Sequence, residues 1–133
     1  MEGNDLVFDL DNLNPGTWFY FEGSSAGVCL RICAGDDAKE ILQKASKKKV
    51  EYKNGQRYSW EETDNDTYRR LLWDFCIVDW KGLKDSKGNE IPCTIDNKLM
   101  LMGKSVKFAK FVDSCIEKLT RVIAEEEEIR EKN

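Results

Sequence analysis

The sequence predicts an α+β fold in which two β-hairpins form a small antiparallel sheet packed against three or four helices, the last of them long. Two pairs of strand-like runs are joined by turn residues, and later segments carry apolar residues at helical spacing. The chain has 133 residues, enough for one domain with an ordinary hydrophobic core. We therefore expect a single domain over residues 1–133, with a flexible lead at 1–15 and a frayed acidic tail at 125–133.

The first hairpin is expected from two apolar runs separated by small turn residues. Trp18-Phe19-Tyr20-Phe21 is rich in aromatic residues, which favour strands, and Val28 to Cys33 follows after the turn-forming segment 23–27. In the second run Val28, Leu30 and Ile32 share one face.

A short helix and a second hairpin come next. Asp36 or Asp37 is the expected N-cap of the helix, with Glu40 placed as in a capping box. The dipeptide Asn54-Gly55 predicts a tight hairpin turn because both residues accept a positive φ. The residues expected on a common face of this hairpin, or on its near diagonal, are Val50, Tyr52, Tyr58 and Trp60.

A helix from about Thr67 to Asp79 carries two apolar stripes. One stripe includes Tyr68, Leu71 and Phe75, and the other has the spacing i, i+4, i+7 at Trp73, Ile77 and Trp80. Such a helix is either enclosed in the core or offers one side to a partner. Under the second interpretation, the residues that form a groove for a segment of another protein are Trp73, Ile77, Trp80, Phe108 and Phe111.

Two further helices complete the predicted fold. After a polar loop at 81–90, Thr94 is the expected N-cap of a short helix that ends before Gly103. Ser105 is placed to cap the last helix. Its apolar residues alternate at spacings of four and three, namely Phe108, Val112, Cys115, Leu119 and Val122.

The composition excludes several classes of enzyme. There is no histidine, so a Ser-His-Asp triad, a Cys-His pair and a His-containing zinc site are all excluded. The five cysteines are odd in number and contain no C-x-x-C pair, which favours free thiols in a reducing compartment. We expect no catalytic residues, no cofactor, no metal and no enzymatic activity.

Charge is distributed unevenly along the chain. The net charge is −4, yet residues 39–57 carry seven basic side chains against two acidic ones. An acidic run at 61–66 follows at once, which argues against nucleic-acid binding. The basic segment is either a solvated surface or a docking patch for an acidic partner, such as the C-terminal glutamates of another copy.

The N-terminus does not look like a targeting segment. The N-terminus is acidic and leads into no long apolar run, so we expect no secretory signal. No segment approaches the ~20 apolar residues of a membrane span. We expect a soluble intracellular protein that does not contact the membrane.

Short motifs in the second half of the chain resemble a known family. They are Asp79-Trp80-Lys81-Gly82-Leu83, Asp85, Gly88-Asn89, Ile91-Pro92-Cys93-Thr94 and Asn97-Lys98, followed by Phe108 to Val112 and the Glu125–Glu128 run. Over about residues 65–133 the sequence resembles the tail assembly chaperones of long-tailed bacteriophages and prophages.

The resemblance implies a non-enzymatic role in an infected or lysogenic bacterium. Such chaperones hold the long tape measure protein while the tail tube polymerises around it, sometimes recruit tail tube protein, and are absent from the mature virion. The implied location is the cytoplasm of the bacterial host, and self-association is expected. The alternatives are a structural minor tail protein of the virion and, less favoured, a small cytoplasmic enzyme.

Overall fold

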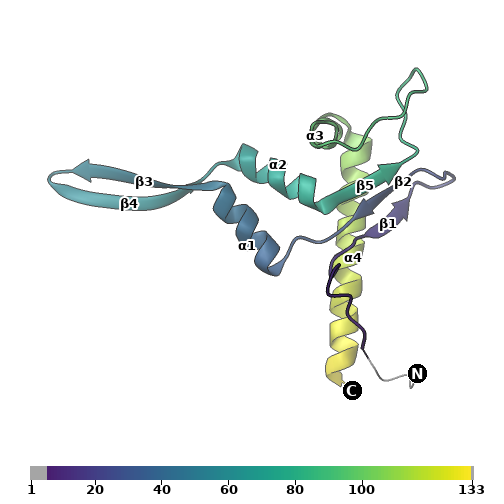
Figure 1. The fold of residues 1–133 in the computed structure, drawn as a ribbon, viewed down its shortest axis with the longest axis horizontal. Coiled ribbons are helices and arrows are strands. Elements are labelled where there is room, and N and C mark those ends of the chain that lie inside the picture. The colour runs from purple at the N-terminus through teal and green to yellow at the C-terminus, as the bar shows by residue number, and fades with distance from the viewer. Residues whose placement is uncertain (1–5, 133) are drawn as a thin grey trace.

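The computed structural model describes residues 6–132 and confirms the α+β class, with four helices and a small antiparallel sheet (Figure 1). One detail of the expected arrangement is wrong. The two hairpins do not share a sheet, because the first hairpin pairs with a strand formed after the second helix. The elements are β1 (Thr17–Tyr20), β2 (Gly27–Leu30), α1 (Gly35–Lys44), β3 (Ser46–Lys53), β4 (Gln56–Thr63), α2 (Asn65–Cys76), β5 (Ile77–Lys81), α3 (Ile95–Lys104) and α4 (Val106–Lys132).

The three-stranded sheet has the order β1-β2-β5, and both pairings are antiparallel. In β1, Phe19 packs against the core, while Trp18 and Tyr20 stack on the exposed face. The ammonium of Lys81 lies over both exposed rings, 4.8 and 5.0 Å from their centroids. The outer face of the sheet is therefore covered by two aromatic rings and a cation.

Strand β5 is the main difference from the sequence expectation. The helix expected to run to Asp79 ends at Cys76, and the next five residues pair with β2. Leu30 is opposite Ile77 while Cys29 is opposite Asp79, so Val78 is the extra residue of a β-bulge. The bulge lets Ile77 and Trp80 point to the same side although they are three residues apart. A spacing of three residues is also typical of a helix, which is why the sequence indicated that the helix continues through Ile77.

The core lies between the sheet and the first half of α4. Val28 and Leu30 from β2, Ile77 and Trp80 from β5, and the first turns of α4 all contribute buried side chains. The α4 members are Phe108, Val112 and Cys115. Phe108 meets the indole of Trp80 edge to face, with ring centroids 5.9 Å apart.

Most helix starts follow from local capping. The Asp64 carboxylate accepts from the N–H groups of Asp66 and Thr67, and the Thr94 hydroxyl accepts from Asn97 N–H. Ser105 accepts from Phe108 N–H at 3.1 Å and so begins α4 as expected. The expected N-cap of α1, Asp36 or Asp37, is wrong. The N-cap is Ala34, whose side chain accepts no hydrogen bond from the helix backbone.

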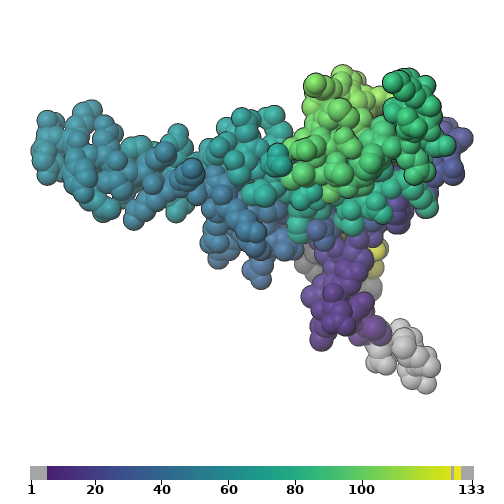
Figure 2. Space-filling view, turned by 45° about the horizontal axis from the view of Figure 1, so that its top comes forward, coloured from purple at the N-terminus to yellow at the C-terminus, as the bar shows by residue number. Residues whose placement is uncertain are grey.

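Strands β3 and β4 form a two-stranded ribbon that projects from the body, and we call residues 46–63 the arm (Figures 1 and 2). Its turn is Asn54-Gly55, with φ of 55° and 76°, as the sequence predicts. Every arm residue except Ser46 is exposed. The base is held by the hydrogen bond from Asp64 N–H to the Ala45 carbonyl, at 2.8 Å.

Helix α4 also extends beyond the body (Figure 1). It continues through the glutamates to Lys132, so the expected frayed tail at 125–133 is helical as far as the described residues reach. Residues 6–16 form neither helix nor strand, and Leu6, Val7 and Phe8 are exposed. The flexibility of the lead at 1–15 stays a prediction, and its first five residues lie outside the described part. Among the helices of residues 6–132, none is long and apolar enough to cross a bilayer.

Candidate functional site: a groove between three helices

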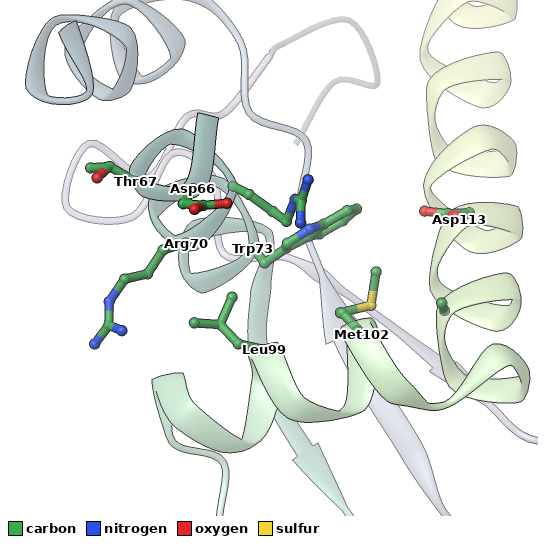
Figure 3. Close-up of a pocket in the computed structure, with 10 residues that line it drawn as sticks. Asp66, Thr67, Arg70, Trp73, Leu99, Met102 and Asp113 are labelled. Atoms are coloured by element: carbon green, nitrogen blue, oxygen red, sulfur yellow. The ribbon is translucent and has the colours of Figure 1, made fainter. Parts of the chain in front are cut away.

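Helices α2, α3 and α4 enclose an open groove of about 570 Å³ (Figure 3). Each helix contributes to its lining, and both apolar and charged side chains are present. The lining residues are Asp66, Thr67, Arg69, Arg70, Trp73, Leu99, Met102, Gly103, Ala109 and Asp113.

The apolar part of the groove lies where α2 faces α3. The indole of Trp73 extends from α2 toward α4, and Leu99 and Met102 point toward it from α3 (Figure 3). All three side chains are half-buried, so one surface of each is available to a ligand. Such a surface suits apolar anchors of a bound peptide.

Charged side chains of both signs line the edge of the groove. Asp66, Arg69 and Arg70 come from the first two turns of α2, and Asp113 lies across the gap on α4 (Figure 3). All four are exposed. Arg70 pairs with Asp96 at 3.8 Å, a solvated contact that links α2 to α3 with little net energy. The edge can therefore pair with either sign of charge on a ligand.

A buried lysine joins the two helices that carry the apolar part. Lys98 on α3 extends its ammonium to Asp74 on α2, 3.0 Å from the carboxylate and 3.1 Å from the backbone carbonyl. Their neighbours in sequence are Trp73 and Leu99, which line the groove. The pair therefore sets the separation of the two apolar walls.

The five residues predicted to bind a partner lie in different places. Trp73 lines the groove, as a binding role requires. Ile77, Trp80 and Phe108 are core residues with at most 6% of their surface exposed, so they offer no binding surface in this fold. Phe111 is half-buried and stacks on Phe21, with ring centroids 4.0 Å apart. The predicted stripe is divided because β5 replaces the last turn of the expected helix.

Sequence reasoning missed the α3 contribution to the groove. The run Leu99-Met100-Leu101-Met102 is apolar on every side of a short helix. Leu101 packs against the core, Met102 lines the groove, and Met100 is exposed. Because this helix is apolar on more than one side, the sequence already indicated that it has a second packing surface.

The motifs of the family resemblance that precede α4 lie in and around one loop. Trp80 donates its indole N–H to the Ile91 carbonyl at 2.6 Å, which closes the segment 81–90 onto the sheet. The Asp85 carboxylate accepts from the N–H groups of Lys87 and Asn89. Asn97 donates to the Pro92 carbonyl at 2.9 Å. These residues thus stabilise the chain between β5 and α3, outside the groove lining.

The thiols are free and are held in the neutral form. All five cysteines are unpaired, and burial raises the pKa of each of them. The effect is largest at Cys76, where burial raises the pKa to about 11. Within residues 6–132, no three Cys, Asp or Glu side chains gather where they could hold a metal ion. The chemistry that the groove offers is apolar contact combined with ion pairing.

One comparison with known proteins gives a match. The model of a family described as YdaY prophage protein matches residues 35–133, which include the arm, all three groove helices and β5. No curated protein and no solved structure matches the chain.

Proposed function

Because the chain belongs to the YdaY prophage protein family, we propose that this prophage protein is a tail assembly chaperone whose groove binds a helical segment of the tape measure protein. The proposal combines the family with the resemblance of residues 65–133 to tail assembly chaperones. The observation that carries it is the three-helix groove, in which Trp73, Leu99 and Met102 form an open apolar surface.

The shape and lining of the groove suit an amphipathic helix. A bound helix places apolar anchors three or four residues apart on one face, and these would lie on Trp73 and Met102. Arg69 and Asp113 at the edge would pair with charges beside the anchors. A chaperone needs contacts that form and release repeatedly, and such an open, partly charged groove favours moderate affinity.

The distribution of apolar residues also supports a holding function. In the described part of the chain, eighteen large apolar side chains are exposed, whereas the buried core has eleven apolar members. Single exposed residues are normal, but here several gather on the lead, on the arm and on α4. Such projections are expected of a protein that contacts other chains.

The experiment is co-purification with the tape measure protein encoded by the same prophage. Met102→Glu places a charge in the groove and should abolish co-purification. Met100→Glu makes the same change two residues away on the same helix, at an exposed position outside the groove, and should retain it. Circular dichroism of both variants checks that α3 still forms.

A charge reversal at the edge gives an independent measurement. Arg69→Glu should weaken binding, while Arg121→Glu, an exposed position on α4 outside the groove, should leave it unchanged. Failure of folded wild-type protein to bind any tape measure fragment would sink the proposal. Stoichiometric presence of the protein in purified virions would instead favour a structural minor tail protein.

A further inference from the structure

The arm lacks the packing that a two-stranded ribbon needs. Each strand has eight residues, and within the described structure no helix covers either face. An isolated two-stranded ribbon is marginal in water and gains stability when a third strand or a helix packs on it. The arm therefore has two faces available for a partner.

The register divides the large side chains of the arm between those faces. Lys49 is opposite Trp60 and Glu51 is opposite Tyr58, so Trp60 and Tyr58 share one face with Lys49 and Lys53. Val50 and Tyr52 lie on the other face, opposite Ser59 and Arg57. The prediction that Val50, Tyr52, Tyr58 and Trp60 share one face is therefore wrong. We call the side with Trp60 and Tyr58 the Trp60 face.

Charge also separates the base of the arm from its outer part. At the base Lys47 is opposite Glu62 and Lys48 is opposite Glu61, so opposite charges compensate across the strands. Beyond them the outer part has three cations, Lys49, Lys53 and Arg57, and one anion, Glu51. Arg57 lies on the other face, so the outer part of the Trp60 face has two cations, Lys49 and Lys53, and one anion, Glu51. Its exposed aromatic surface therefore adjoins a net charge of +1.

The projecting part of α4 has the complementary character. Val122 and Ile123 are 48% and 41% exposed, and Glu125 and Glu126 follow on the next turn. Glu125 and Glu126 are three and four residues after Val122, so the three side chains share one side of the helix. We call residues 119–126 the α4 end.

These two surfaces cannot meet within one molecule. The arm and the α4 end project from the body in different directions, with α1 and α2 between them (Figure 1). Figure 2 shows the arm separated from the rest of the chain along most of its length. Contact between them requires a second molecule.

We propose that the Trp60 face of the arm docks on the α4 end of a second copy of this chain. Trp60 and Tyr58 cover Val122 and Ile123, and Lys49 and Lys53 lie beside Glu125 and Glu126. Removal of apolar surface from water stabilises the contact, and the opposite charges set its register.

Reciprocal docking gives a closed dimer with two equivalent contacts, whereas one-sided docking gives an open chain of copies. Neither the arm nor the α4 end lines the three-helix groove. The inference does not depend on binding of the tape measure protein.

Reversal of charge on each surface tests the contact by sedimentation of the purified full chain. Lys49→Glu/Lys53→Glu should weaken self-association at least about tenfold, because like charges then face each other. Glu125→Lys/Glu126→Lys should have the same effect. An equimolar mixture of the two variants should associate again, since each arm then meets an α4 end of opposite charge.

The matched control reverses two cations on the other face of the arm. Lys48→Glu/Arg57→Glu makes the same change in net charge and should leave association near the wild-type level. Trp60→Ala should weaken association, while Tyr52→Ala on the opposite face should not. Circular dichroism of every variant checks that the body of the protein is folded.

A wild-type chain that stays monomeric at its highest soluble concentration overturns the proposal. The same holds if the two charge variants, each folded, fail to associate when mixed. Binding of a single-stranded oligonucleotide by a monomeric wild type, with loss in Lys49→Glu/Lys53→Glu, would assign the Trp60 face to nucleic acid instead.

Discussion

The ammonium of Lys98 is buried against the carboxylate of Asp74, with 3.0 Å between Nζ and Oδ1. Lys98 is 6% exposed, while the Asp74 side chain remains 45% exposed. The contact joins the C-terminal half of α2 to α3. An ammonium removed from water depends on such a partner, because burial of an unpaired charge is costly.

Loss of the carboxylate should therefore destabilise the protein more than loss of the ammonium. We expect Asp74→Ala to cost about 2 kcal/mol and Lys98→Met about 1 kcal/mol, since the half-exposed partner is screened by water. The double variant should cost less than the sum. Urea denaturation of the four proteins measures this coupling, and strictly additive costs would contradict the pairing.

The contribution of Trp80 to the free energy of unfolding should come from its indole N–H as well as from its ring. Trp80→Phe keeps an aromatic ring against Phe108 but leaves the Ile91 carbonyl without its 2.6 Å donor. We expect a loss of about 1–3 kcal/mol in unfolding free energy. Trp60→Phe, the same change on the exposed arm, should stay within about 0.5 kcal/mol of wild type. Equal effects at the two positions would count against the hydrogen bond.

Cys76 should be the least reactive thiol of the folded chain. Burial raises its pKa from 9.0 to about 11, so the thiolate fraction at neutral pH falls roughly 100-fold. Alkylation followed by peptide mass mapping should find Cys76 labelled last. In urea all five cysteines should react at similar rates, which supplies the control. Early labelling of Cys76 without denaturant would refute its burial.

The start of α2 should respond to acid through Asp64. Hydrogen bonds from the backbone and hydroxyl of Thr67, the largest cause, lower the pKa of this carboxyl below 3.8. A lowered folded-state pKa stabilises the protein above the unfolded pKa, and this stabilisation is lost as the pH falls through the folded value. Asp64→Asn, which retains a capping oxygen, should remove that part of the acid dependence.

Melting temperature measured from neutral pH down to pH 2 tests the effect. The difference in melting temperature between wild type and Asp64→Asn should become smaller when the pH is below 3.8, the ordinary pKa of the carboxyl. Asp36→Asn is the control, because Asp36 lies in the first turn of α1 without being its cap. If this difference in melting temperature stays constant with pH, the charge of the Asp64 carboxylate is not its cause.

The candidate site was only partly predictable from the sequence. Trp73 was selected because of its helical spacing with Ile77 and Trp80, and it does line the groove. The other two are core residues, since a β-bulge at Val78 reproduces the spacing of a helix within a strand. Leu99 and Met102 were missed because an apolar run on a short helix does not say which side faces the core.

Local chemistry determined the parts of this fold whose partners lie within a few residues. The Asn54-Gly55 turn and the caps at Asp64, Thr94 and Ser105 follow from the sequence, because the backbone groups that they satisfy are close along the chain. Only the tertiary structure decided that α2 ends at Cys76. The hydrogen bonds and buried surface that favour a strand there come from β2, far away in the sequence.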